Sequence, residues 1–216
     1  MKHVLLADQH SVMRKGIKML LLENQISSPD QIDEAETEEE LTTLVRLKNY
    51  HFILLDMRLS CSDFSKLMGW IRVTSPSSHI LIFTESAEEM YAMRCLQMGA
   101  KGFLKKASTN EQVITAIQTV FNGEKYLSAY LSDLLLNSVS NPQRTENPFD
   151  KLSQREMEIV HQLDNGKTLK DISKILKIEY STVNTYKRRI FEKLNVNSVL
   201  TLSRLKQSFS ESSRNF

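Results

Sequence analysis

Paired cysteines, long apolar runs and targeting segments are what this sequence lacks. The two cysteines, Cys61 and Cys95, show no metal-binding or redox spacing, so each is expected to pack as a small apolar residue or to lie free at the surface. No apolar run approaches the ~20 residues of a membrane helix. Met1 leads into a strand-like segment without the apolar core of a signal peptide. We therefore expect a cytoplasmic protein that is not exported and has no membrane partner.

Length and charge favour two different domains. The chain has 216 residues, whereas single domains cluster near ~100–150. Residues 1–148 carry 15 basic and 18 acidic side chains, a net charge of −3, whereas residues 149–216 carry 13 and 8, a net charge of +5. A small basic unit suits a polyanion such as nucleic acid, because neutralised phosphates release counterions. A merely solvated basic surface is the alternative.

The first 125 residues alternate short apolar runs with amphipathic stretches, which predicts βα units around a parallel sheet. The second apolar run, Gln31–Ala35, contains acidic residues, which favours a strand at the edge of the sheet. We expect a flavodoxin-like (βα)5 fold. The predicted strands are His3–Ala7, Gln31–Ala35, His51–Leu55, His79–Phe83 and Gly102–Leu104, and the predicted helices are Val12–Glu23, Glu38–Lys48, Ser65–Val73, Ala87–Met98 and Asn110–Asn122. A capping box of Ser108 and Glu111 is expected to open the fifth helix.

A polar stretch at residues 137–147, bracketed by Pro142 and Pro148, reads as a linker. The segments after it favour helices alone, near Ser153–Asn165, Leu169–Leu176, Ser181–Leu194 and Val199–Ser208. We therefore predict a first domain at 1–125, a linker at 126–148 and a small all-α domain at 149–216.

Four chemically active side chains follow the predicted strands. Asp8, Asp56, Thr84 and Lys106 come directly after the first, third, fourth and fifth apolar runs. Ligands of open α/β sheets bind outside the carboxyl ends of the strands, so these residues should converge. Each has an ordinary structural explanation taken singly, as a turn cap, a β-branched filler or a solvated lysine.

Together these residues suit phosphoryl transfer onto a carboxylate. Asp56 would attack, a bound Mg²⁺ would bridge carboxylate and phosphoryl oxygens, and Lys106 and Thr84 would stabilise the charge. The aspartyl phosphate would then draw Thr84 and Lys106 inward. Such a site would act as a switch and would not catalyse repeated turnover of a substrate. We therefore expect that the protein is not an enzyme.

The segments VLLADQH, FILLDMRL, ILIFT and GAKGFLKK resemble the receiver domain of two-component response regulators. The resemblance implies that a sensor histidine kinase phosphorylates Asp56. It also implies that Asp8 and the Arg58 backbone carbonyl are Mg²⁺ ligands and that Phe103 moves with Thr84. A cis peptide bond is implied after Lys106. A phosphatase of the haloacid dehalogenase type is disfavoured, because the position two residues after the nucleophile is Arg58 rather than an acid.

Several positions depart from the receiver pattern. Gln9 stands where the family has a second acid, so a neutral ligand replaces a carboxylate and Mg²⁺ affinity should fall. Ser60 and Phe64 replace the usual Pro and Gly, and Glu85 could repel an incoming phosphodonor or bind a cation of its own. A receiver that signals without phosphorylation is therefore the alternative function.

The stretch from Leu152 to Val196 resembles the helix-turn-helix of the LuxR/NarL/FixJ family. The residues on which this resemblance rests are Leu152, Arg155, Glu156, Gly166, Ile172, Leu176, Ser181, Thr182, Val183, Lys193 and Leu194. The helix ends can be predicted from the residues themselves. Ser153 and Glu156 form a capping box at the start of the first helix, Gly166 ends that helix, and Thr168 caps the second. The family commonly has His at Tyr186.

The third helix of this domain has a core face and a polar face. Val183, Tyr186, Ile190 and Leu194 recur at helical spacing and should face the core. The opposite face has residues that suit base edges in the major groove, namely Asn184, Thr185 and Arg188, and flanking phosphate contacts, namely Lys187, Arg189 and Lys193. The alternative is a helical interaction module with a solvated basic face.

The expected partners follow from these assignments. They are double-stranded promoter DNA, a sensor histidine kinase and a second copy of the chain in the active state, with RNA polymerase as a further candidate. Dimers gain affinity by occupying two half-sites, and family resemblance suggests pairing through the fourth and fifth helices of the receiver.

Overall fold

A computed structural model describes residues 2–59, 64–133 and 148–212, without the side chains of 154 and 207–212. The chain divides into two compact units, Met1–Leu136 and Asn137–Phe216. The predicted boundaries at 125 and 148 stay predictions, and most of the predicted linker, together with Ser60 and Cys61, lies outside the described residues. Within the described part, no helix is long and apolar enough to cross a membrane.

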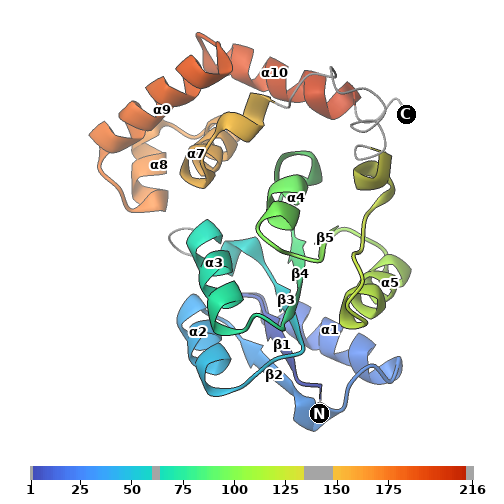
Figure 1. Ribbon diagram of the computed structural model, residues 1–216. Coiled ribbons are helices and arrows are strands. Elements are labelled where there is room, and N and C mark those ends of the chain that lie inside the picture. Colours follow the sequence, from blue (N-terminus) through green and yellow to red (C-terminus); the bar gives the residue numbers. More distant parts are fainter. Residues whose placement is uncertain (1, 60–63, 134–147, 213–216) are drawn as a thin grey trace. The chain divides into compact units, whose positions relative to one another are not determined.

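The N-terminal unit contains the predicted parallel sheet (Figure 1). Its order is β2-β1-β3-β4-β5, so the acid-containing β2 is an edge strand as expected. The strands are β1 (Val4–Ala7), β2 (Ile32–Ala35), β3 (Phe52–Leu55), β4 (His79–Thr84) and β5 (Gly102–Lys105), each within one residue of its predicted ends. Because all neighbouring pairs are parallel, the carboxyl ends of the strands meet at one edge.

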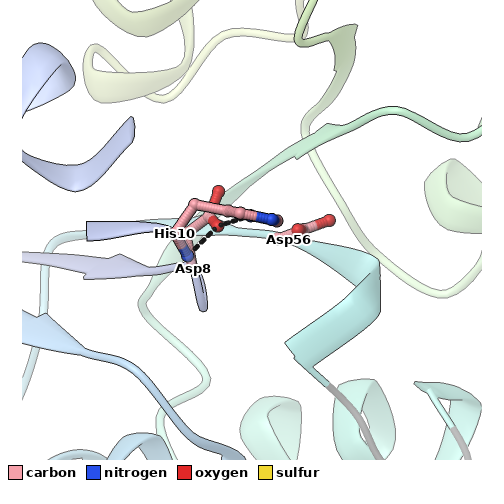
Figure 2. Close-up of side chains that lie close together, drawn as sticks. All are labelled: Asp8, His10 and Asp56. Carbon is pink, nitrogen blue, oxygen red and sulfur yellow. Dashed lines mark hydrogen bonds and ion pairs between the residues drawn. The ribbon is translucent and has the colours of Figure 1, made fainter. Parts of the chain in front are cut away.

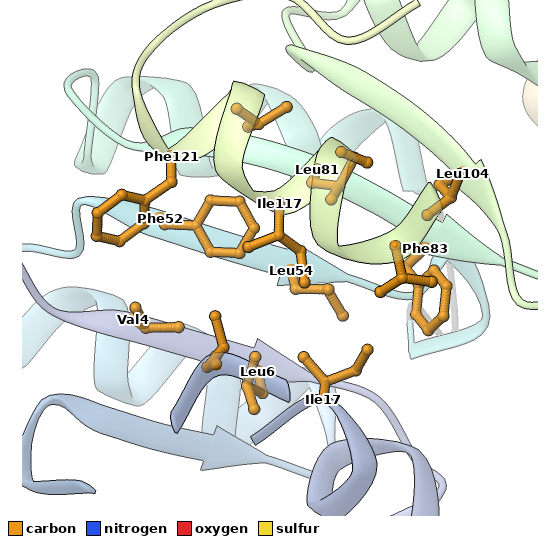
Figure 3. Packing of buried hydrophobic residues seen from close by; sticks show 14 of the residues in the cluster. Val4, Leu6, Ile17, Phe52, Leu54, Leu81, Phe83, Leu104, Ile117 and Phe121 are labelled. Carbon is orange, nitrogen blue, oxygen red and sulfur yellow. The ribbon is translucent and has the colours of Figure 1, made fainter. Parts of the chain in front are cut away.

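Five α-helices alternate with these strands, which confirms the flavodoxin-like fold. They are α1 (Ser11–Glu23), α2 (Glu38–Leu47), α3 (Phe64–Thr74), α4 (Glu88–Gln97) and α5 (Asn110–Phe121). Short 3-10 turns lie at Pro29–Gln31 and Met57–Leu59. Helices α1 and α5 cover one face of the sheet: Ile17 and Ile117 pack with Leu6, Leu54 and other strand residues in one cluster (Figure 3). This packed core holds the strands, and therefore the residues at their ends, in fixed positions.

Two local expectations for the N-terminal unit were wrong. The box that opens α5 is Thr109 with Gln112, one residue later than predicted, because Ser108 closes a turn by donating its N–H to Lys105 O at 3.0 Å. The peptide after Lys106 is trans. Position 107 is an alanine, and a cis bond before a non-proline residue costs about 2.5–4 kcal/mol.

The C-terminal unit is helical throughout its described residues, as predicted. A 3-10 turn at Pro148–Lys151 precedes α7 (Gln154–Asp164), α8 (Leu169–Leu176), α9 (Tyr180–Leu194) and α10 (Val199–Ser212). The Ser153–Glu156 box and the Thr168 cap are both present, and Gly166 follows α7 with φ +72°. Helices α8 and α9 with their short turn form the expected helix-turn-helix.

Candidate functional site

The structure brings three of the four strand-end side chains into contact at the carboxyl edge of the sheet. Asp8 follows β1, Asp56 follows β3 and Lys106 follows β5, and all three side chains are at most 7% exposed. A backbone hydrogen bond joins the ends of β1 and β3, since the Asp56 N–H donates to Ala7 O at 2.9 Å. The convergence follows directly from parallel pairing, because each residue comes just after its strand.

Lys106 contacts two carboxylates at once. Its Nζ lies 2.6 Å from Asp8 Oδ2 and donates to Asp56 Oδ2 at 2.7 Å. The other oxygen of Asp56 accepts a bond from the Arg58 backbone N–H at 3.2 Å. Two buried negative charges therefore face one buried positive charge. A buried charge is costly unless it is compensated, so this site favours a further cation.

Thr84, the last residue of β4, and Phe103 are the predicted switch residues, and both are fully buried. Thr84 Oγ1 donates to Ser86 Oγ at 3.3 Å, in the loop that leads into α4. Phe103 lies within β5. Their movement on phosphorylation stays a prediction.

Arg14 is a buried residue of this edge that the sequence analysis missed. Its Nη1 donates to Asp8 O at 2.6 Å, while Nε and Nη2 donate to Glu34 and Glu36 at 3.1 and 3.0 Å. Arg14 thereby fixes the backbone of the loop that carries Asp8. A possible signal was its place on the inner face of α1, in line with Ile17 and Leu21.

His10 is the second missed residue. Its backbone N–H donates to Asp8 Oδ1 at 2.8 Å, and its ring Nδ1 lies 2.9 Å from the same oxygen. Asp8, His10 and Asp56 form a group whose ligand atoms all lie within 4.8 Å of one another, as Figure 2 shows. The signal was simple proximity, since His10 follows Asp8 by two residues.

The residues that depart from the receiver pattern lie around this edge. Gln9 is exposed beside Asp8. Glu85 was expected to repel a phosphodonor or to bind a cation of its own, and its Oε2 is in fact 2.7 Å from Arg58 Nη1. Both side chains are about half exposed. The Arg58 guanidinium thus faces the Glu85 carboxylate, and the effect of Glu85 on an anionic donor stays a prediction.

In the C-terminal unit, α9 has the two faces that its periodicity predicts. Val183, Ile190 and Leu194 are buried and Tyr186 is half-buried. The opposite face exposes Asn184, Thr185, Arg188 and Arg189. Arg188 is 74% exposed and makes only a loose 3.7 Å pair with Glu192, so its guanidinium is available to a ligand.

Lys193 differs from the other basic residues of α9. Its Nζ donates to Glu156 Oε2 at 2.7 Å, and that carboxylate also accepts the Ser153 backbone N–H at 2.7 Å. Burial by itself would raise the pKa of the Glu156 carboxyl, but the bonds from Lys193 and Ser153 outweigh burial and lower that pKa. Lys193 therefore joins α9 to the start of α7. Its predicted phosphate contact stays a prediction, and its ammonium already has a partner.

Comparison with known proteins identifies both units. Residues 4–118 match the family model of the response regulator receiver domain, and residues 150–205 match that of bacterial regulatory proteins of the luxR family. The chain belongs to the response regulator family. Its receiver domain and its luxR-type domain occur in the order that the sequence predicts.

Relatives and solved structures agree with this assignment. The chain is 29% identical to response regulator UvrY of Escherichia coli strain K12, over 95% of this chain and 93% of that protein. It is 30% identical to response regulator GacA of Pseudomonas aeruginosa, over 94% of each chain. A structure of RcsB from Salmonella enterica serovar Typhimurium, bound to promoter P1flhDC in the presence of the phosphomimetic BeF3⁻, has a TM-score of 0.64 at 20% identity, covering 96% of this chain and 98% of that one. This last likeness supports the fold.

Proposed function

We propose that phosphorylation of Asp56 by a sensor histidine kinase switches the luxR-type domain of this protein onto promoter DNA. One observation carries the proposal: Lys106 lies between the buried carboxylates of Asp8 and Asp56 at 2.6 and 2.7 Å. This contact supports the proposal, because an aspartyl phosphate at Asp56 would need a positive counter-charge beside it. The membership of both domains in regulatory families supports the same conclusion.

The chemistry assigns one role to each residue. An Asp56 carboxylate oxygen forms the new bond to phosphorus while the P–N bond of the phosphohistidine donor breaks, and the departing imidazole takes up a proton. Mg²⁺ would supply charge compensation on the phosphoryl oxygens when it is held by Asp8, Asp56 and the Arg58 carbonyl. Lys106 stabilises the same charge as a hydrogen-bond donor. The Thr84 hydroxyl then turns toward the phosphoryl group and leaves Ser86.

The output is sequence-specific DNA binding through α9. Asn184, Thr185 and Arg188 read base edges, and Lys187 and Arg189 contact phosphates. Phosphorylation favours a homodimer, so that two copies of α9 occupy two half-sites. Contact with RNA polymerase would follow at the promoter. The site takes up one phosphoryl group and passes on no product, so the protein acts as a regulator and not as an enzyme. Its proposed partner, promoter DNA, implies that it acts in the cytoplasm.

One feature favours a second candidate, a receiver that signals without phosphorylation. Gln9 replaces an acid that would bind Mg²⁺, which lowers the expected affinity of the site for that ion. Such a receiver would keep its fold and its DNA-binding domain but take up no phosphoryl group.

Intact-mass spectrometry separates the two candidates. Acetyl phosphate with Mg²⁺ is expected to add one phosphoryl group to the wild-type chain and none to Asp56→Asn, because that substitution removes the attacking oxygen. Asp33→Asn is a matched control in the same domain, because Asp33 lies on the edge strand β2 and its carboxylate accepts a hydrogen bond from Lys48 Nζ. Equal incorporation by the wild type and Asp56→Asn would show that Asp56 is not the acceptor. No incorporation by the wild type would favour the second candidate.

A further inference from the structure

We propose that the His10 imidazole is a ligand of the receiver's cation site, which therefore binds divalent first-row transition-metal ions such as Ni²⁺ more tightly than Mg²⁺. The inference rests on the proposed function for the presence of a cation at this edge. It goes beyond that function in the ligand set and in the class of metal.

The geometry of three side chains supports this ligand set. His10 Nδ1 lies 2.9 Å from Asp8 Oδ1, and adjacent ligands of an octahedral ion at about 2.1 Å stand about 3 Å apart. The ligand atoms of Asp8, His10 and Asp56 all lie within 4.8 Å of one another. In Figure 2 the His10 ring reaches over Asp8 toward Asp56. The Lys106 ammonium lies among the same three side chains, 2.6 Å from Asp8 Oδ2, 2.7 Å from Asp56 Oδ2 and 3.5 Å from His10 Nδ1. The movement that brings the three ligand atoms onto one ion would therefore also shift this ammonium.

The charge at this edge also calls for a cation. Asp8 is 1% exposed and Asp56 is fully buried, so neither carboxylate is solvated. Lys106 supplies one positive charge to the two carboxylates, at 2.6 and 2.7 Å. One negative charge is left over before any phosphoryl group arrives. A divalent ion would compensate it and leave positive charge for the phosphoryl oxygens.

The His10 ring is not needed to orient Asp8. The backbone N–H of His10 already donates to Asp8 Oδ1 at 2.8 Å, and the Arg14 guanidinium holds the Asp8 carbonyl. The imidazole contact therefore duplicates a bond that the backbone makes. With 46% of its side chain exposed, the ring remains accessible to an ion from solvent.

The donor set decides the class of metal. Mg²⁺ prefers oxygen ligands, whereas imidazole nitrogen suits Ni²⁺, Zn²⁺ and Cu²⁺, and affinities at mixed nitrogen and oxygen sites rise from Mn²⁺ to Cu²⁺. At this edge the residue after Asp8 is the neutral Gln9, and His10 follows it directly. His10 supplies the nitrogen that transition ions favour.

Calorimetric titration of the full-length chain tests the proposal without any phosphodonor. Ni²⁺ and Mg²⁺ are titrated separately into the wild type, His10→Ala and His161→Ala, the last being a control for a histidine in the other unit. His10→Ala is expected to weaken Ni²⁺ binding about tenfold or more while Mg²⁺ binding changes by less than about twofold. His161→Ala should change neither affinity, and Asp8→Asn should weaken both.

Two outcomes would overturn the proposal. One is an unchanged Ni²⁺ affinity in His10→Ala, and the other is a wild type that binds Mg²⁺ as tightly as Ni²⁺. If His10→Ala loses the native far-UV circular dichroism spectrum, His10→Gln replaces it, because glutamine is polar and of similar size but offers an amide oxygen in place of the imidazole nitrogen. The affinities are independent of phosphoryl uptake by Asp56, so failure of the metal proposal and failure of the proposed function are separately visible.

Discussion

Lys106→Met is expected to lower the free energy of unfolding of the receiver domain by about 3–5 kcal/mol, because removal of one partner of a buried ion pair leaves uncompensated charge. Asp8 and Asp56 would then face each other without the ammonium that now contacts both. Urea denaturation followed by Trp70 fluorescence measures the effect. Trp70 is the single tryptophan and lies on α3 of the receiver domain, so the signal reports this domain.

Three controls separate this charge effect from general damage. Lys105→Met removes the neighbouring, exposed lysine of β5 and should leave stability within about 0.5 kcal/mol of the wild type. Combining Lys106→Met with Asp8→Asn should recover much of the loss, because one of the two facing carboxylates is gone. Millimolar Mg²⁺ should stabilise Lys106→Met more than the wild type. An unchanged denaturation midpoint in Lys106→Met would show that the ammonium of Lys106 does not stabilise the two carboxylates.

Arg188→Ala and Lys187→Ala are expected to impair DNA binding in different ways. Arg188 is exposed on the polar face of α9, where a guanidinium can bond a guanine edge in two places. Its loss should cost about 1–3 kcal/mol of binding free energy and relax the preference at particular base pairs. Lys187, whose Nζ lies 5.3 Å from the centre of the Phe191 ring, should contact phosphate. Its loss should weaken binding to all sequences and reduce the salt slope by about one.

Selection from random duplexes provides the target, and fluorescence anisotropy at several salt concentrations gives the affinities. Lys125→Ala is the matched control, since Lys125 is an exposed cation of the receiver domain. Lys193 is unsuitable as the phosphate-contact variant because its bond to Glu156 gives it a structural role. Equal losses on every duplex for Arg188→Ala and Lys187→Ala, with base preference unchanged, would contradict the assigned orientation of α9.

The sequence was sufficient for the fold and for the strand-end residues. Apolar runs separated by amphipathic stretches imply parallel βα units, and parallel pairing alone brings Asp8, Asp56 and Lys106 to one edge. Spacing on α9 was likewise sufficient to separate its core face from its polar face, because helical periodicity is a local property.

Side-chain pairs between distant segments could not be predicted in this way. The contacts of Arg14 with Glu34 and Glu36, of Arg58 with Glu85 and of Lys193 with Glu156 depend on how separate elements approach one another. Periodicity shows which face a residue occupies but not which charge it meets there. The one-residue error at the start of α5 has a local cause, since two adjacent hydroxyl residues can each cap a helix and the preceding turn decides between them.

If phosphorylation of Asp56 controls DNA binding, the affinity of the full-length chain for its selected duplex must depend on it, and this affinity is the most direct test. The measurement compares the wild type and Asp56→Asn, each with and without acetyl phosphate, at one fixed salt concentration. Phosphorylated wild type is expected to bind about tenfold more tightly than the unmodified chain, a coupling of about 1.4 kcal/mol, and Asp56→Asn should not respond. Equal affinities of phosphorylated and unmodified wild type would contradict the account.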